Sequence, residues 1–579
     1  MNKNIIVSAL FVCFTYFLSA QLISNGSFES DWSGWETELI NAANATFDII
    51  TENSSHSGKK MLKVNVAYRG RPANSVRLTC HAIETSKDRI YMVRFWAKAA
   101  QNDSRMVVTL AGENTNTQCE FRIDESFDSW KNGWQMYQYL FTTIDSKLDM
   151  VVTFNTNGVY YIDDFEIIDD THQVLDLKTQ IMWQNKLQGY GWVSGDNDVS
   201  VVLPDDRVAW IFSDSFLGNP KPNENYLRAS TMINNLIVIE DEEGNLTSHY
   251  QGTSTAPRTL VPAPSGSVYW VGDGIVENDK LKVMYNEWRG LEFYNRAGVA
   301  VFSLPDLKRE KTVIPAYTGS DIPNALLQDG DYIYIYTEER PGGFTRYTRV
   351  ARVPAGELDS HSTPWEFYTQ QGTWDTDPSK ALRIVSAPGC SVRKLGEGNY
   401  VMSGVPNLSN EFALWFSTTP WGPWGNKTVI YNMPSEEGVL FYLGHIHDRP
   451  ESAQTGVYTL SYSLYPFGGY VPQQLADKGT YLPVYLKANL RTLSPYTTES
   501  AVAQTRNDKQ VRLFPNPVIH TLNIAGADQF EAVQIFDIAG TLIAEENHEI
   551  INMSDLDSGL YISKIICKNT TEEHIIIKR

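Results

Sequence analysis

Residues 191–218 read GWVSGDNDVSVVLPDDRVAWIFSDSFLG, and this stretch carries the pattern that decides the fold. The run VVLPDDRVAWIF contains two apolar, β-type segments separated by the turn signal Pro204–Asp206. Asp196 and Asp198 precede the first segment, and Asp214 follows the second. An antiparallel hairpin returns the chain to its start, so we expect these carboxylates at one mouth of the hairpin. Asp205 and Asp206, the acids of the turn, lie at the opposite end of the hairpin.

The same rhythm of strand, turn and strand recurs through residues 181–490. It is visible in YWVGDGIVENDKLKVMYNEW, NALLQDGDYIYIYTEE, CSVRKLGEGNYVMSGV and VYTLSYSLYP. About 300 residues at roughly 60 per four-stranded unit correspond to about five units, which predicts a five-bladed β-propeller. Residues 171–180 are interpreted as a short link before it.

Residues 21–170 are predicted to form a separate β-sandwich of short strands such as MLKVNVAY and RMVVTLAG. The opening LISNGSFESDWSGWE and the closing GVYYIDDFEIIDD resemble the jelly-roll carbohydrate-binding modules of bacterial glycosidases. In that family an acid of each motif often holds a structural Ca²⁺, and the matching positions are Glu29 and Asp164. Cys80 and Cys119 fall in this module as a pair that an oxidising compartment would allow to bond. Candidate sugar platforms are Trp32, Trp35, Trp96, Trp130 and Trp134.

The C-terminal residues 511–579 follow a polar linker at 491–510. The segments FPNPV, VQIFDIAGTLI and LDSGLYISKI resemble, in this order, the sorting domain of the Bacteroidetes type IX secretion system. The resemblance implies a small β-sandwich without a catalytic role. It also implies that the secretion machinery is a partner and that the protein is secreted or attached to the cell surface.

The N-terminal sequence agrees with export of the protein, and the composition limits its partners. Residues 1–20 have one lysine, an apolar run and a small-residue end, so we predict a signal peptide cleaved before Gln21. No later segment is long and apolar enough for a transmembrane helix. The formal net charge of −20 argues against nucleic acid as a partner. It also mildly disfavours a polyanionic substrate, although a local basic groove could override this. The 12% aromatic content suits either β-rich cores or sugar binding.

The central region resembles propeller families of unknown function that are related to bacterial endo-D-arabinanases. The resemblance rests on the 195–218 hairpin, on YWVGDGIV, on ALLQDGDYIYIYTE with RVARVPAG, and on HIHDRPE with GVYTLSYS. It implies that Asp196 and Asp214 are the catalytic pair, with Asp198 as the rival for the first position. Ser213 replaces the glycine usual before the second acid, so specificity for arabinan does not carry over.

Other polar and aromatic residues at strand ends are candidates for substrate binding. In GHIHDRP, alternation would place His445 and His447 on one strand face, as metal ligands or with His447 as the base of a lyase. The full set of binding candidates is Trp192, Asp198, Asp273, Glu287, Trp288, Arg289, Glu338, His447 and Arg449.

The sequence therefore predicts an all-β, exported glycoside hydrolase that acts on a polysaccharide or oligosaccharide. Paired carboxylates can supply the acid and the base that glycoside hydrolysis needs, without a cofactor, and we expect inversion at the anomeric carbon. Two alternatives stay open at this point. One is a polysaccharide lyase that uses His447 as base, and the other is a non-catalytic glycan-binding propeller.

Overall fold

The computed structural model describes two stretches of the chain, residues 22–496 and 512–578, with internal gaps. The predicted signal peptide and Trp130 lie outside the described residues. The chain divides into two compact units, Met1–Thr497 and Thr498–Arg579, and each is treated by itself. Strands make up nearly all of the regular structure, so the all-β prediction is confirmed. The undescribed internal positions are 88, 102, 124–133, 173, 186–188, 220–230, 291, 318, 320, 343–344, 435–438, 467–480, 515–517, 519, 526–529, 538–541, 549, 555, 557–558 and 569–570.

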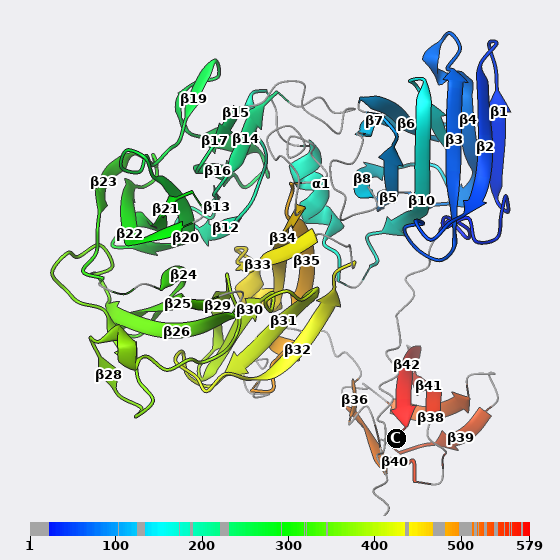
Figure 1. Ribbon diagram of the computed structural model, residues 1–579. Helices are drawn as coiled ribbons and strands as arrows, with labels where there is room; N and C mark the ends of the chain where they lie inside the picture. Colours follow the sequence, from blue (N-terminus) through cyan, green and yellow to red (C-terminus); the bar gives the residue numbers. More distant parts are fainter. Residues whose placement is uncertain are drawn as a thin grey trace, which may run out of the picture. The chain divides into compact units, whose positions relative to one another are not determined.

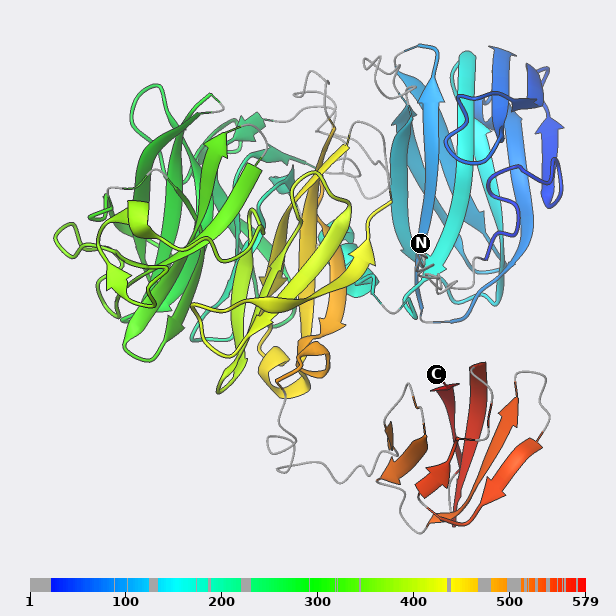
Figure 2. The ribbon, with the colours of Figure 1, turned by 60° about the horizontal axis from the view of Figure 1, so that its bottom comes forward.

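The N-terminal part of the first unit is a sandwich of two antiparallel sheets, drawn in blue to cyan in Figures 1 and 2. One described sheet has the order β1 (Trp35–Leu39), β4 (Val76–Glu84), β9 (Lys147–Phe154), β6 (Ser104–Ala111) and β7 (Asn116–Ile123). The other has the order β2 (Asn44–Thr51), β3 (Lys60–Tyr68), β10 (Gly158–Asp169), β5 (Ile90–Ala99) and β8 (Gln135–Thr142). A short 3₁₀ turn, η1 (Ala73–Ser75), precedes β4.

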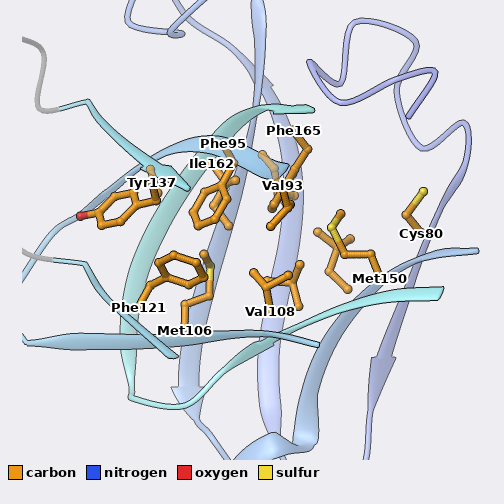
Figure 3. Packing of buried hydrophobic residues seen from close by; sticks show 14 of the residues in the cluster. Cys80, Val93, Phe95, Met106, Val108, Phe121, Tyr137, Met150, Ile162 and Phe165 are labelled. Atoms are coloured by element: carbon orange, nitrogen blue, oxygen red, sulfur yellow. The ribbon is translucent and has the colours of Figure 1, made fainter. Parts of the chain in front are cut away.

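Alternation along these strands builds the core of the sandwich. In β6, for example, Met106, Val108 and Leu110 point inward, while the residues between them are partly exposed. Figure 3 shows Phe95, Phe121 and Phe165 packed in this core, with Cys80 at its side. Both Cys80 and Cys119 are buried free thiols. The disulfide considered for them is therefore absent, because they lie on β4 and β7, which are separated in the sheet by β9 and β6.

A helix joins the sandwich to the sheets that follow. The helix α1 (Leu177–Asn185) replaces part of the expected link, and its Gln184 side chain bonds the backbone N–H and C=O of Leu140 in β8. Gln180 bonds the backbone of the last central strand in the same way, through the Tyr485 N–H and the Pro483 C=O. One helix thus makes matched amide contacts with elements on both sides.

Residues 191–489 contain, in their described part, five antiparallel sheets in succession (Figure 1). The first is β12 (Val199–Val202), β13 (Val208–Phe212), β16 (Leu236–Glu240) and β17 (Leu246–His249), and the second is β20 (Val268–Glu277), β21 (Lys280–Arg289), β22 (Glu292–Ser303) and β23 (Arg309–Val313). The third is β24 (Ile322–Asp329), β25 (Tyr332–Gly342), β26 (Thr345–Pro354), β27 (Glu366–Tyr368) and β28 (Trp374–Asp375). The fourth is β29 (Ser391–Gly396), β30 (Asn399–Gly404), β31 (Glu411–Ser417) and β32 (Gly425–Asn432), and the fifth is β33 (Val439–His447), β34 (Val457–Pro466) and β35 (Val484–Asn489).

Smaller elements complete this region. A three-stranded extension of the first sheet is formed by β11 (Gly191–Gly195), β14 (Ser215–Gly218) and β15 (Thr231–Ile233), and a ribbon is formed by β18 (Gln251–Thr253) and β19 (Ala256–Arg258). The short helical segments are η2 (Pro378–Lys380), α2 (Ser452–Thr455) and α4 (Leu490–Leu493). None of the helices in the described residues is long and apolar enough to cross a bilayer.

The first strands of the five sheets lie beside one another. β12 contacts β20, β20 contacts β24, β24 contacts β29, β29 contacts β33, and β33 contacts β12 again. This arrangement brings the loops that precede the first strands into one neighbourhood.

The second unit holds two antiparallel sheets in its described residues. One is β36 (Arg512–Phe514), β37 (Thr521–Ala525) and β40 (Ile550–Asn552), and the other is β39 (Leu542–Glu546), β38 (Phe530–Asp537), β41 (Gly559–Cys567) and β42 (Thr571–Lys578). Val533, Ile535 and Ile565 are among the side chains that build its own small core.

Candidate active site

The two acids of the 191–218 hairpin lie at a break in the middle of a longer strand pairing. β12 pairs with β13 on one side of the break, and β11 pairs with β14 on the other. Across the break, the Asp196 N–H donates to the Asp214 C=O at 3.2 Å, and the Ser213 N–H donates to the Asp196 C=O at 3.0 Å. The structure therefore brings Asp196 and Asp214 together, although the hairpin continues past them instead of ending there.

Asp196 is half-buried and accepts a hydrogen bond from the Tyr442 hydroxyl at 2.8 Å through Oδ2. Burial, followed by the negative charge of Asp214, raises the pKa of Asp196 to about 7, against the stabilising effect of the Tyr442 and Tyr481 hydroxyls. Its Oδ1 has no hydrogen-bond partner among the described residues. Asp196 is thus a carboxyl group that can keep its proton near neutral pH.

Asp214 has a different set of partners. Its Oδ1 accepts hydrogen bonds from Asn234 Nδ2 and from Trp270 Nε1, each at 2.8 Å. Burial raises the pKa of Asp214, while these two donors oppose the rise. Amide and indole N–H groups can only donate here, so they stabilise the ionised carboxylate. Burial thus raises the pKa of both acids, and they differ in the donors that oppose the rise: hydroxyls at Asp196, and an amide and an indole N–H at Asp214.

Asp198 and His447 lie beneath this pair and are fully buried. Asp198 Oδ1 accepts from the Ser461 hydroxyl at 2.9 Å, and its Oδ2 lies 3.4 Å from His447 Nε2. His447 also contacts the hydroxyls of Ser461 and Ser200 at 2.8 and 3.0 Å. A base or a sugar-binding group must reach its substrate, so this enclosed network has the character of a structural support.

Asn197, which the sequence did not single out, is the buried link between three strands. Its backbone is left-handed (φ 58°), and its Nδ2 donates to the Val271 C=O at 2.6 Å and to the Ser213 hydroxyl at 3.0 Å. Its Oδ1 lies 2.9 Å from His445 Nε2, which must carry the proton because an amide oxygen only accepts. Burial lowers the pKa of His445 to about 4, so this histidine is neutral. Asn tolerates the left-handed region, which was the available sequence signal.

Two other predicted binding residues, Trp192 and Asp273, are buried and contact other parts of the protein. Trp192 is fully buried, 4.8 Å from the Trp183 ring. Asp273 is buried and accepts from the Leu326 N–H at 2.7 Å and from the Gly274 N–H, which connects β20 to β24. Burial raises its pKa to about 6.

Arg449 lies away from the catalytic candidates. It forms an ion pair with Glu240, which is paired with Val208 at the start of β13, whereas Asp214 follows the end of that strand. The structure therefore places Arg449 toward the opposite end of the first sheet from the acids.

The remaining candidates form a wall beside Asp214. The ring of Trp270, the donor to Asp214, lies 4.8 Å from the ring of Trp288, and the guanidinium of Arg340 lies 5.1 Å from the Trp288 ring. Arg340 Nε donates to Glu338 Oε1 at 2.6 Å. Glu287 and Arg289, on either side of Trp288 in β21, share the Ser267 hydroxyl at 2.7 and 3.0 Å. Trp270 is the member of this wall that the sequence did not indicate.

The two acids predicted to bind calcium, Glu29 and Asp164, contact the same segment of the sandwich, residues 56–60. Hydrogen-bond donors of that segment already contact their carboxylate oxygens. Glu29 Oε1 accepts from the N–H groups of Lys59 and Lys60 at 2.6 and 2.7 Å. Asp164 lies 2.6 Å from His56 Nδ1 and accepts from the Ser57 hydroxyl at 2.7 Å. Backbone N–H groups and an imidazole at these oxygens do not fit a bound cation. Across the described residues, moreover, no three His, Cys, Asp or Glu side chains gather as a metal site.

The sandwich contains a cavity of about 490 Å³ at one end of its β6–β7 side. Asn155 Oδ1 has no hydrogen-bond partner among the described residues. The cavity is lined by Arg69, Ala73, Arg105, Glu120, Asn155, Thr156 and Asn157.

The predicted sugar platforms of the sandwich differ in exposure: Trp35, Trp96 and Trp134 are buried, and Trp32 is 37% exposed.

Comparison with protein families identifies three regions. Residues 20–159 match a model described as "Carbohydrate binding domain", residues 183–470 match "Domain of unknown function (DUF5005)", and residues 512–578 match "Secretion system C-terminal sorting domain". The sorting domain indicates type IX secretion, so the protein is secreted or held at the cell surface. No curated protein matches the chain.

Among solved structures, a putative hydrolase from Bacteroides ovatus is similar at 21% identity, over 55% of this chain and 91% of that one, with a TM-score of 0.46. A GH43_1 enzyme from Xanthomonas citri complexed with xylotriose is similar at 17% identity, over 51% and 86%, with a TM-score of 0.33. A structure described as "CBM4 structure and function" is similar at 16% identity, over 26% and 99%, with a TM-score of 0.21.

Proposed function

We propose that the protein is an exported glycoside hydrolase in which Asp196 is the general acid and Asp214 is the general base. The observation that carries the proposal is the adjacent pair of carboxyl groups, which accept hydrogen bonds from different kinds of donor. Asp196 keeps its proton up to about pH 7, while Asp214 receives two N–H donors that favour its ionised form. Environments that push two carboxyl pKa values apart are a recurrent basis of acid and base roles.

In this mechanism Asp196 donates its proton to the glycosidic oxygen as the bond to the leaving sugar breaks. Asp214 removes a proton from a water molecule, whose oxygen bonds to the anomeric carbon. Asp196 ends ionised and Asp214 ends protonated, and exchange with solvent restores both. We propose inversion of the anomeric configuration, which requires room for that water between the carboxyl groups.

We also propose that the five central sheets are the blades of a closed propeller. The circular order of contacts among β12, β20, β24, β29 and β33 supports this arrangement. It would place the first hairpin and the Trp270–Trp288 wall at one mouth. The carbohydrate-binding domain would hold the glycan through the sandwich cavity, whose size lies in the usual range for ligand pockets.

The test is a glycan panel with product analysis by mass spectrometry on the mature chain. We expect saturated oligosaccharide products, and a loss of about 100-fold or more in turnover for Asp196→Asn and for Asp214→Asn. Asp205→Asn, which removes an acid at the distant turn, is the matched control and should retain activity. Retained turnover in both active-site variants would exclude the pair as the catalytic acids, and an unsaturated product would indicate a lyase.

A further inference from the structure

Four arginines gather beside the candidate catalytic pair, around two buried glutamates. Glu338 is 6% exposed at its side chain, with Arg340 Nε at 2.6 Å and Arg346 Nε at 3.4 Å from its Oε1. Glu287 is fully buried, with Arg296 Nε at 3.7 Å and Arg289 Nη2 at 4.0 Å. In these four contacts the arginines outnumber the glutamates two to one.

Arg346 is influenced by the charge of its neighbour Arg340 as well as by burial. Burial, followed by the positive charge of Arg340, lowers the pKa of Arg346, although Glu338 opposes this shift. One further acid, Glu292, stands opposite Arg289 in the β21–β22 hairpin and is exposed. Counted over these named residues, four arginines stand against three glutamates, in a chain whose formal net charge is −20. A positive patch that runs against the charge of the whole protein calls for an anionic ligand.

The cluster is within reach of a glycan at the catalytic pair. The contacts run from Asp214 to Trp270, from Trp270 to the Trp288 ring, and from that ring to the guanidinium of Arg340. The side chains of Arg340 and Arg289 are 40% and 44% exposed, while the glutamates that they contact are covered. The glutamates thus hold the arginines in place, and the arginines present the charge.

We propose that this cluster of Arg289, Arg296, Arg340 and Arg346 binds an anionic substituent of the glycan, either the carboxylate of a uronic acid or a sulfate ester. The planar guanidinium group pairs with such oxyanions through two parallel hydrogen bonds. The Trp270–Trp288 edge lies between this subsite and Asp214, where it can support the sugar ring that joins them. The proposal rests on the proposed function only in taking a glycan as the ligand of this mouth.

The experiment measures binding, so that it is independent of turnover. The full mature chain carrying Asp196→Asn is titrated with matched polymers: glucuronate-bearing xylan and its carboxyl-reduced form, polygalacturonate and its methyl ester, and a sulfated galactan and its desulfated form. We expect tighter binding of at least one anionic form than of its neutral counterpart, by about tenfold, with a preference that weakens at high salt. Whether the carboxylated or the sulfated pair shows it identifies the source of the anion.

The arginines are tested with Arg289→Gln and Arg340→Gln, separately and together, in the same background. We expect the double variant to lose the anionic preference while it keeps its melting temperature and its affinity for the neutral polymer. Arg207→Gln removes one positive charge at the far turn, where Arg207 pairs with Asp205, and should change neither affinity. Equal binding of both members in every pair, or a preference that survives in the double variant, would overturn the proposal. Failure of the hydrolase assignment would instead appear as binding without products in the chain with Asp196 intact.

Discussion

Trp270 and Asp214 form a direct contact between the second and the first central sheet, because the indole Nε1 donates to Asp214 Oδ1 at 2.8 Å. Trp270 is half-buried, and its ring packs on Trp288 with 4.8 Å between the ring centroids. A donor fixed in this way stabilises the ionised carboxylate at no cost in reorganisation. The contact therefore ties the protonation state of the proposed base to the packing of the neighbouring sheet.

Trp270→Phe should raise the pKa of Asp214, because it removes one of the two N–H donors that stabilise the charged form. The proposed base must be ionised, so the acidic limb of the pH profile of kcat/KM should move to higher pH, by about one unit. Initial rates on the substrate from the glycan panel, measured across pH, give the limb directly. Trp421→Phe, in an aromatic cluster around Tyr334, is the control that should leave the limb unchanged. An unmoved limb in Trp270→Phe would show that Asp214 does not titrate in the rate-limiting step.

Tyr442→Phe should move the alkaline limb of the pH profile of kcat/KM. The Tyr442 hydroxyl donates to Asp196 Oδ2 and lowers a pKa that burial and Asp214 have raised to about 7. Without this donor the pKa of Asp196 should rise further. The proposed acid must be protonated, so activity should persist to higher pH in the variant than in the unchanged protein. The measurement is the alkaline limb of kcat/KM.

Tyr400→Phe is the matched control for Tyr442→Phe. It removes a phenol that bonds a different carboxylate, Asp329 Oδ2, at 2.6 Å. It should leave the alkaline limb in place. A shift of the limb to lower pH in Tyr442→Phe would contradict the assignment of Asp196 as the acid.

The local parts of the site were predictable from the sequence, and the long-range parts were not. The turn at 204–206 and the meeting of Asp196 with Asp214 follow from the geometry of one hairpin. Trp270 is 56 residues from Asp214, and His445 is 248 residues from Asn197, so their contacts depend on how sheets lie against one another. No local pattern encodes that arrangement.

The alternation of side chains along a strand also does not predict how deeply each residue is buried. The spacing of His445 and His447 correctly suggests one strand face, yet it does not show that both are buried, as they are. The sequence offers Asp198 as the rival of Asp196 for the first catalytic position. The structure covers Asp198 completely and leaves Asp196 partly open, since Asn197 turns the backbone between them.

The sandwich cavity offers a separate prediction about glycan binding. Asn155 Oδ1 lacks a donor among the described residues, and a sugar hydroxyl can supply one. Asn155→Ala should therefore weaken binding of the panel glycan to the full chain by roughly fivefold to tenfold, with little effect on stability, because the Asn155 N–H keeps its bond to the Arg105 C=O. Asn116→Ala, at an exposed position of β7, is the control. Unchanged affinity, measured by titration calorimetry, would place the glycan elsewhere on the sandwich.

His447→Ala should act on stability and not on chemistry. His447 is fully buried, fills the space beside the Trp210 ring at 4.7 Å, and contacts the hydroxyls of Ser200 and Ser461. Its removal leaves a cavity and unsatisfied hydroxyls, at a cost of about 2–4 kcal/mol. We expect a lower midpoint in urea, with turnover at 25 °C in the folded protein within a few-fold of the unchanged chain. Ser461→Ala, which removes the hydroxyl shared by His447 and Asp198, should destabilise in the same direction but less. Turnover abolished in a His447→Ala protein of unchanged stability would show instead that His447 takes part in the reaction, as the lyase interpretation requires.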